Sequence, residues 1–468
     1  MAPQGPDLRF EDVSRLSRRT LLGGSLGLLA TGSTLPLIAK GTTQPSLQST
    51  VHTTRDADDE SFWDMVADQF IVRPEITYMN TGTRGPSPAS VYLAQVDAIR
   101  AANEDRLGYV NNVYTSDFKD SLRRKLAGFV GCAANEIAIT NNTTEGMGIG
   151  TLGVELRPGD EIIYTNHDHS GGAQPVNLRC ARDGTVPVVV DLSAPGYHPP
   201  PSTQHIVDAF EAAITKRTRL ISFCHINYTD GCVMPVAEIC EMARSRGVLT
   251  LVDGAHPPGM LDLDLKALGC DMYAGACHKW MLAAQLTGFL YVREDLQDRV
   301  WPAIYSGPVQ GRNMYGAPDD AEKGRTAQRY ETHGSINYAA GKSIDAAVDF
   351  HNGIGAANIE ARDRFMASVA RERLASMDGV QVFVAPGSDL CAGLVSFRVR
   401  DVDTKALNRF LWETHQVYIR EVRHPEIDWD ANRLSLHIMV NRRKLDAALD
   451  AIEEVARKPS LVAPFTEA

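Results

Sequence analysis

The sequence predicts an α/β fold in which a mostly parallel β-sheet lies between helices, followed by a smaller α+β C-terminal domain. The chain has 468 residues, of which 44% are hydrophobic and 22% charged, as in a globular protein of roughly two to three domains. Short β-branched runs alternate with amphipathic stretches through its middle, which is typical of parallel strands joined by helices. From about residue 346 the pattern changes to a long helix and then to mixed strands and helices.

The first 40 residues have the pattern of an export signal. Ser17-Arg18-Arg19-Thr20-Leu21-Leu22 precedes an apolar, glycine-rich run that ends near Ile38, as in twin-arginine signals. Glycines and a proline weaken a helix in this run, which barely reaches the length of a membrane span. We expect cleavage near Ala39, export to the periplasm by the twin-arginine machinery and no membrane span in the mature protein. The alternative is an arginine pair ahead of an ordinary apolar helix or anchor.

Residues 41–75 are expected to form a linker and N-terminal segment, and residues 76–345 the large domain. The predicted strands of that domain are 136–140, 161–165, 186–191, 219–224, 248–252, 271–274 and 288–292, with amphipathic helices at 202–215 and 236–246. In such folds the functional side chains collect in loops after the carboxyl ends of strands. Residues 346–468 are predicted to form the small domain.

Charge and cysteine content argue against several kinds of partner. Lys plus Arg total 47 against 58 Asp plus Glu, a formal net charge of −11 with no local basic patch, so nucleic acid is not an expected partner. The eight cysteines form no C-x-x-C pair and mostly lie in apolar runs, which argues against a zinc site or a disulfide framework. We expect buried free thiols and no metal.

A lysine and an aspartate follow two of the predicted strands. Asp253 lies in Val252-Asp253-Gly254-Ala255-His256 and Lys279 in Cys277-His278-Lys279-Trp280, so both can project into one crevice. A buried lysine amine can form a Schiff base with an aldehyde cofactor, and an ionised aspartate can keep a pyridinium nitrogen charged. Taken alone, Lys279 could be a surface lysine and Asp253 an aspartate that caps a turn. Together, the two residues predict the cofactor pyridoxal 5'-phosphate (PLP).

These motifs resemble those of the class V aminotransferases, a family of fold-type-I PLP enzymes, and within it the isopenicillin N epimerase-like branch. The resemblance covers roughly residues 75–457 and rests on Asp253-Gly-Ala-His256, His278-Lys279-Trp280 and Thr287-Gly288-Phe289-Leu290-Tyr291-Val292. It implies the fold of a fold-type-I PLP-dependent transferase, with Lys279 and Asp253 as the catalytic pair. It also implies a small-molecule substrate that is an amino-acid-like amine or a peptide.

The resemblance implies further cofactor contacts in the large domain. Thr143 and Thr144, with backbone N–H groups at the start of a helix, hold the phosphate. The same residues would also fit an ordinary helix N-cap formed by Asn142 or Thr144. His167 stacks on the pyridine ring, with His169 as its substitute.

Two more histidines and a serine complete the implied cofactor site. His256 matches the position that hydrogen-bonds the cofactor phenolate or ring edge, and His278 the position near the phosphate. Family members often carry an asparagine where Asn227 or Tyr228 stands here, and which of the two reaches the cofactor is open. Ser335 matches a hydroxyl that reaches the partner's phosphate, so the resemblance implies a homodimer; a simple Gly-Ser turn is the alternative.

Two arginines of the predicted small domain match carboxylate-binding positions. Arg433, in Arg433-Leu-Ser-Leu-His437, resembles the family arginine that pairs with the substrate α-carboxylate, a task that suits a planar guanidinium. Arg420 falls where a second such arginine can appear, and a surface ion pair is the alternative for each. The loop after Arg420 contains no cysteine, unlike that of cysteine desulfurases, which disfavours persulfide formation.

The resemblance favours an exported PLP enzyme that transaminates or epimerises an amino-acid-like amine. Exported relatives of this branch include a periplasmic enzyme that modifies the siderophore pyoverdine, so an exported peptide metabolite is the expected kind of substrate. A PLP-dependent lyase of cysteine-type substrates is an alternative on the same fold. A non-catalytic binding protein that keeps this fold is the alternative of another class.

Overall fold

The computed structural model describes residues 54–193, 202–306, 326–331, 334, 336–384 and 389–462. They belong to one compact unit, Thr50–Ala468. Arg18, Arg19 and Ser335 lie outside the described residues, so the export signal and the dimer contact of Ser335 stay predictions.

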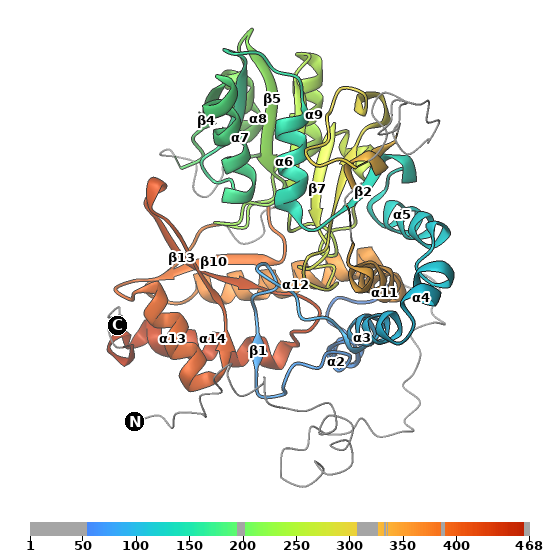
Figure 1. The fold of residues 1–468 in the computed structure, drawn as a ribbon. Helices are drawn as coiled ribbons and strands as arrows, with labels where there is room; N and C mark the ends of the chain where they lie inside the picture. The colour runs from blue at the N-terminus through green and yellow to red at the C-terminus, as the bar shows by residue number, and fades with distance from the viewer. Residues whose placement is uncertain are drawn as a thin grey trace, which may run out of the picture. The chain divides into compact units, whose positions relative to one another are not determined.

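A seven-stranded sheet forms the middle of the large domain (Figure 1), with the strand order β2-β8-β7-β6-β5-β3-β4. Its strands are β2 (Ile137–Thr140), β3 (Glu161–Thr165), β4 (Val186–Val190), β5 (Thr218–Cys224), β6 (Leu249–Gly254), β7 (Met272–Ala276) and β8 (Gly288–Val292). Neighbouring strands are parallel except at β8, which runs antiparallel to both β2 and β7. The prediction of a mostly parallel sheet is confirmed.

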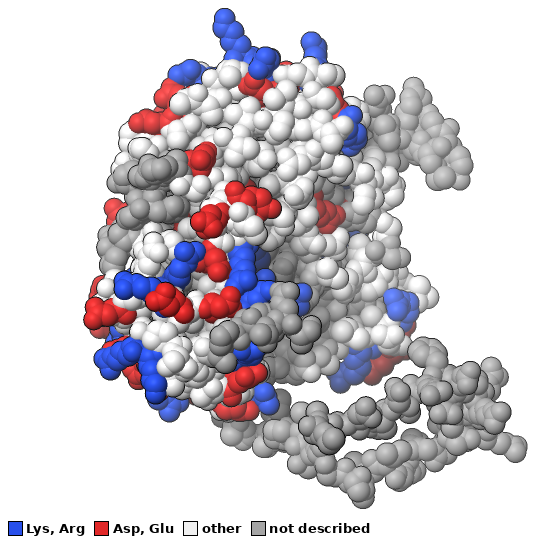
Figure 2. Space-filling model, turned by 90° about the vertical axis from the view of Figure 1, so that its left-hand side faces the viewer, with Lys and Arg blue, Asp and Glu red and all other residues white. Residues whose placement is uncertain are grey.

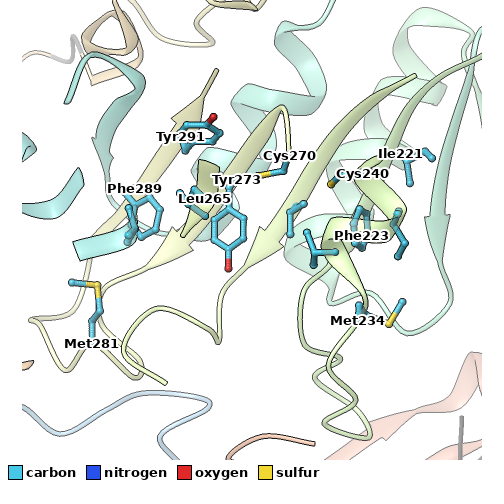
Figure 3. Close-up of a cluster of buried hydrophobic side chains, with 14 of the residues drawn as sticks. Ile221, Phe223, Met234, Cys240, Leu265, Cys270, Tyr273, Met281, Phe289 and Tyr291 are labelled. Atoms are coloured by element: carbon cyan, nitrogen blue, oxygen red, sulfur yellow. The ribbon is translucent and has the colours of Figure 1, made fainter. Parts of the chain in front are cut away.

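Both faces of this sheet are apolar, because successive strand residues point to opposite sides. On β5, Leu220 belongs to one buried cluster and Ile221 to the other. The cluster that contains Ile221 packs against α3 (Ala89–Glu104), α5 (Ser116–Val130), α8 (Thr203–Ala213), α9 (Val236–Ser245) and α11 (Tyr338–Ile354). Figure 3 shows part of it, with Tyr273 and Phe289 on the neighbouring strands β7 and β8 and Phe223 on β5.

The cluster on the opposite face packs the sheet against α6 (Thr143–Gly153) and α7 (Ser170–Asp183). With helices on both sides, the strands other than the exposed edge strand β4 are largely buried, which is why they appear in the sequence as nearly continuous apolar runs. The predicted strands and helices of this domain match the observed ones to within two residues at either end.

The C-terminal residues form a second sheet with helices of their own. Its strand order is β12-β13-β10-β9, and all pairs are antiparallel. The elements are α12 (Ala356–Ala375), β9 (Val380–Val382), β10 (Leu394–Val399), α13 (Thr404–His415), β12 (Arg420–His424), β13 (Trp429–Ser435) and α14 (Arg442–Arg457). The predicted domain boundary at residues 345–346 falls inside helix α11, so this helix continues from one region into the other.

The segment expected to be a linker contains ordered elements. Helix α2 (Glu60–Ala67) buries Trp63, and the Glu60 carboxylate pairs with Arg362 of α12 at 2.5 Å. Further along, β1 (Thr77–Tyr78) pairs in parallel with β11 (Val417–Tyr418). The two remaining α-helices in the described ranges are α4 (Arg106–Asn112) and α10 (Leu265–Leu268). The N-terminal segment therefore packs onto the C-terminal region.

All eight cysteines are free, and six of them are buried. Cys277 lies in the core cluster beside the sheet, as the sequence predicts. Of the helices in the described ranges, none combines the length and apolar character that a bilayer crossing requires. The described residues also contain no cluster of His, Cys, Asp and Glu side chains suited to a metal ion.

Candidate active site

A cavity of about 360 Å³ lies where the carboxyl ends of β6 and β7 meet the N-termini of α6 and α7 and strands β12 and β13. Side chains from separate loops converge at such strand ends. The predicted site residues that line the cavity are Thr143, Thr144, Asp253, His256, His278, Lys279, Arg420 and Arg433.

Lys279 and Asp253 face this cavity and influence each other's protonation. Burial lowers the pKa of the Lys279 amine to about 8, against the raising effect of the Asp253 charge and with a smaller contribution from Arg433. Burial raises the pKa of Asp253, while Lys279 and the backbone N–H of Ala255, which donates to Oδ1 at 3.0 Å, oppose that rise. A lowered lysine pKa leaves a larger neutral, nucleophilic fraction at neutral pH.

The N-terminus of α6 forms one wall of the cavity. Asn142 is its N-cap, with Oδ1 accepting from the Glu145 backbone N–H at 2.9 Å. The Thr143 hydroxyl is buried and has no hydrogen-bond partner among the described residues, whereas Thr144 is exposed. N–H groups of a first helical turn lack intrahelical acceptors and carry partial positive charge. This helix end therefore fits an anion that also accepts from the Thr143 hydroxyl.

His169 lines the cavity and His167 does not. His169 caps α7, with Nδ1 accepting from the Gly171 N–H at 3.0 Å, and burial together with nearby positive charges lowers its pKa to about 4. His167 is buried with Nδ1 2.6 Å from the Thr229 hydroxyl and its ring edge-on to Trp429. The loop after β3 thus turns the two rings to different places, and of the two it is His169, named from the sequence as the substitute for His167, that lines the cavity.

His256 and His278 both line the cavity as neutral rings. The Trp280 indole N–H donates to His256 Nδ1 at 3.1 Å. His278 Nδ1 lies 2.8 Å from the Thr287 carbonyl oxygen, so that nitrogen carries the hydrogen. Burial lowers the pKa of both imidazoles.

Arg433 and Arg420 are register partners on β13 and β12, which places both side chains on the same face of the ladder. Arg433 is only 3% exposed; Nη1 donates to the Tyr228 carbonyl oxygen at 2.6 Å, and Nε has no partner among the described residues. Burial, followed by the charge of Arg420, lowers the pKa of Arg433 to about 10. Two adjacent cations of this kind can bind a carboxylate.

Two other charged side chains of the cavity wall, Arg423 and Glu421, already have partners. Arg423 binds Asp403 at 2.6 Å and Asp430 at 3.1 Å, and the Glu421 carboxylate accepts from the Asn408 side chain. The charges left to attract a ligand are therefore positive near β12 and β13. On the face drawn in Figure 2, basic and acidic side chains are interspersed rather than gathered into one broad patch.

The loop after β1 forms another wall of the cavity, which the sequence did not predict. Gly82, Thr83 and Arg84 line the cavity. A Cβ on Gly82 would lie 2.9 Å from Ser435 Oγ and 3.1 Å from Arg433 Nη2, so only glycine allows this close approach. In the sequence, this loop is marked only by a run of small residues after a short strand. That run indicates a cavity wall only when the long-range pairing of β1 with β11 is known.

Of the two candidates in the loop after β5, Tyr228 lines the cavity. Asn227 is 1% exposed, and its Oδ1 accepts from the Cys224 thiol at 3.0 Å. The Tyr228 ring meets the His169 ring edge-to-face, with centroids 5.0 Å apart. Tyr228 thus holds the orientation of the histidine that faces the cavity.

Comparison with known proteins agrees with this geometry. The family model for class V aminotransferases matches residues 88–431. The isopenicillin N epimerase of Amycolatopsis lactamdurans is 29% identical over 407 residues, covering 84% of this chain and 99% of that protein. A probable cysteine desulfurase of Methanothermobacter thermautotrophicus is 27% identical over 394 residues, covering 81% and 94%.

Solved structures show the same fold. The cystine C–S lyase C-DES in complex with cysteine persulfide has a TM-score of 0.74 and 26% identity, covering 82% of this chain and 99% of that one. A C-DES mutant with glycine covalently linked to its PLP cofactor has a TM-score of 0.74 and 25% identity, covering 83% and 98%. The fold is therefore that of the fold-type-I PLP enzymes.

The residues of the cavity fit PLP, the cofactor of class V aminotransferases. The buried Thr143 hydroxyl, for which the described part of the chain supplies no partner, and the α6 N-terminus suit the phosphate. Lys279 supplies an amine for the aldehyde, and Asp253 a carboxylate for the ring nitrogen. A Cβ at Gly172 would lie 3.2 Å from Asp253 Oδ2, so the glycine keeps the space beside this carboxylate open.

Proposed function

The chain belongs to the class V aminotransferase family of PLP enzymes, and from that premise we propose that it transaminates or epimerises an amino-acid-like amine at its α-carbon. The observation that carries the proposal is the convergence of Lys279, Asp253 and Arg433 on one cavity. They supply an amine with a lowered pKa, a buried carboxylate and a buried guanidinium group whose Nε has no described partner.

Each of these side chains has a separate task. Asp253 presents its carboxylate to the cofactor ring nitrogen, and Arg433 orients the substrate through its α-carboxylate. Bound PLP withdraws electrons from the substrate α-carbon and so makes its proton more acidic. Lys279, with a pKa of about 8, has enough neutral amine at neutral pH to take that proton and, once protonated, to return one.

A PLP-dependent lyase of cysteine-type substrates is the second candidate. Its support is the likeness to the cystine C–S lyase C-DES over 82% of this chain. A persulfide-forming desulfurase is disfavoured, because residues 421–427 after Arg420 contain no cysteine.

Absorbance of the purified full chain with PLP tests whether the protein is an enzyme of this class. We expect a visible band that borohydride abolishes and that is missing in Lys279→Ala. Lys125→Ala is the matched control, since this lysine pairs with Asp345 and Asp349 outside the cavity. A colourless wild-type protein that is indifferent to PLP would contradict the proposal and favour a non-catalytic binding protein.

Incubation of the holoenzyme in D₂O with amino acids and peptides tests the reaction. Deuterium at an inverted α-carbon indicates epimerisation, and a keto product that requires an acceptor ketoacid indicates transamination. Ammonia released with a ketoacid from a single amine indicates the lyase. Mass spectrometry and chiral chromatography distinguish the three results.

We also propose that the protein is exported and acts on an exported peptide metabolite, such as a siderophore. The support is Ser17-Arg18-Arg19-Thr20-Leu21-Leu22 with its apolar run, together with the resemblance to a branch that has exported relatives. Fractionation of bacteria that express the full chain tests the export. We expect periplasmic protein with an N-terminus near Ala39, and cytoplasmic retention when Arg18 and Arg19 are both changed to Lys. A mature form that keeps both arginines would contradict it.

A further inference from the structure

Trp280 follows the cofactor lysine directly, and the proposed function gives it no task. Its side chain is fully buried, and its ring meets the His256 ring edge-to-face with centroids 6.5 Å apart. The indole Nε1 lies 3.1 Å from His256 Nδ1. Because an indole N–H can only donate, His256 Nδ1 must be the acceptor and carries no hydrogen.

The other nitrogen of His256 must then carry the ring hydrogen. The ring is neutral, because burial and the charges of Lys279 and Arg433 hold the pKa of His256 well below its usual value. His256 lines the cavity, and its Cε1, the carbon between the two ring nitrogens, lies 3.2 Å from where a Cβ on Gly82 would be. The ring therefore presents an Nε2–H donor on the side away from Trp280.

Trp280 itself is held by the C-terminal region. Its carbonyl oxygen lies 3.0 Å from His351 Nε2 and 2.9 Å from His437 Nε2, and His437 Nδ1 lies 2.7 Å from Asp363 Oδ2. A Cβ on Gly393 would lie 2.9 Å from the indole Cζ3, so this glycine makes room for the ring. The backbone and the indole are thus fixed by side chains of α11 and α12 and by residues flanking the C-terminal sheet.

We propose that Trp280 is a positioning residue that holds His256 in its Nε2–H tautomer, so that His256 donates to an acceptor atom of the ligand in the cavity. Only the identity of the ligand rests on the proposed function. With PLP as that ligand, the acceptor is a deprotonated oxygen of the cofactor ring. The tautomer is a property of the protein alone. A phenylalanine at position 280 keeps an aromatic ring but removes the N–H, which leaves His256 able to place its hydrogen on Nδ1 and to turn a lone pair toward the ligand oxygen.

Nitrogen-15 NMR of the cofactor-free full chain, labelled at histidine and assigned with His256→Gln, tests the tautomer. We expect the hydrogen of His256 on Nε2 in the wild type and a shift toward Nδ1 in Trp280→Phe. A wild-type protein with the hydrogen on Nδ1, or a Trp280→Phe protein with an unchanged spectrum, would overturn the proposal.

Equilibrium binding of PLP tests the consequence for the ligand. Trp280→Phe is expected to weaken binding about 10-fold, the effect of one hydrogen bond to a charged group. Trp63→Phe is the matched control, because that buried indole donates to the Asp56 carbonyl at 3.1 Å away from the cavity. The affinity of this control should match that of the wild type.

The same change made in a His256→Phe variant distinguishes two roles of Trp280, the positioning of His256 and simple packing. In His256→Phe, the further change Trp280→Phe is expected to alter PLP affinity less than about 2-fold, because the tautomer no longer exists. A full 10-fold loss in that background would show that Trp280 acts through packing and would overturn the proposal. If the wild type does not bind PLP at all, the proposed function fails, and the NMR result still decides the tautomer.

Discussion

Burial of a single amine sets the chemistry available at Lys279. Its pKa is about 8 instead of 10.5 because burial outweighs the attraction of Asp253, and only the neutral amine attacks an aldehyde. The rate at which the cofactor-free protein captures PLP should therefore rise with pH to a midpoint near 8. Stopped-flow absorbance across pH 6 to 11 measures it, and a midpoint near 10.5 would refute the assignment.

Asp253→Asn provides the control for this pH dependence. The Asp253 carboxylate raises the pKa of Lys279, so its loss should move the midpoint to lower pH. An unchanged midpoint would show that the two groups do not interact across the cavity.

The guanidinium of Arg433 should determine how tightly a substrate carboxylate is held. Arg433→Lys loses the bidentate geometry, so we expect KM to rise about 10- to 100-fold in steady-state kinetics. Arg423→Lys is the matched change, because Arg423 lines the same cavity with its charge taken by Asp403 and Asp430. An equal rise of KM in both variants would argue against a specific role for Arg433.

The sequence was sufficient to predict that a residue lies at the cavity where its motif directly follows a strand. Asp253 and Lys279 lie at or just beyond the ends of β6 and β7, so the strand pattern alone brings them together. His167 and His169 are two residues apart in a turn, and the direction of each ring depends on how that turn folds. The sequence therefore favoured His167 over its substitute His169, whereas in the structure it is His169 that lines the cavity.

The start of helix α6 offers a test of the phosphate site. Thr143→Val replaces a buried hydroxyl that has no described partner, so we expect the stability of the cofactor-free protein to change little. PLP affinity should fall about 5- to 20-fold, because the phosphate loses one hydrogen bond. Fluorescence titration with PLP measures the affinity.

Thr151→Val is the matched control on the same helix. The Thr151 hydroxyl is also buried and without a partner in the described ranges, but Thr151 does not line the cavity. PLP affinity should stay within about 2-fold of the wild type. A similar loss in both variants would mean that the helix, and not the hydroxyl, binds the phosphate.

Among strands and helices, local patterns were predictable and long-range pairings were not. An apolar run marks a buried strand regardless of its neighbours, and so β3 and β8 have the predicted bounds. Nothing local to β8 shows that it runs antiparallel to β7. The pairing of β1 with β11 joins residues about 340 positions apart, so the cavity wall that it supports was missed.

Across the molecule, the predicted division into two domains is crossed by continuous structure. Helix α11 spans the boundary at residues 345–346, and α2 of the expected linker pairs with Arg362 through Glu60. The composition of residues 41–75 is polar enough to suggest a linker, but Trp63 and its neighbours are buried. The cavity consequently has walls from the N-terminal, middle and C-terminal thirds of the chain.

We propose that the protein is a homodimer, and the surface of α3 and α4 supports this. Tyr92, Val96 and Ile99 are 44%, 39% and 51% exposed on α3, and Leu107 on α4 is 72% exposed. Their spacing on α3 forms one apolar stripe, and large exposed apolar stripes commonly mark protein interfaces. Because Ser335 matches a residue that reaches the partner's phosphate, the two copies would share their cofactor sites.

Sedimentation of the full chain tests this assembly. Changing Ile99 and Leu107 together to Glu should convert dimers to monomers, since two buried charges per copy disfavour the interface. If the cofactor site is shared, PLP affinity should fall in the same variant. Ile71→Glu is the control, because Ile71 is 56% exposed but lies outside helices α3 and α4. A wild-type protein that sediments as a monomer with full PLP affinity would exclude a shared site, and the role expected for Ser335 with it.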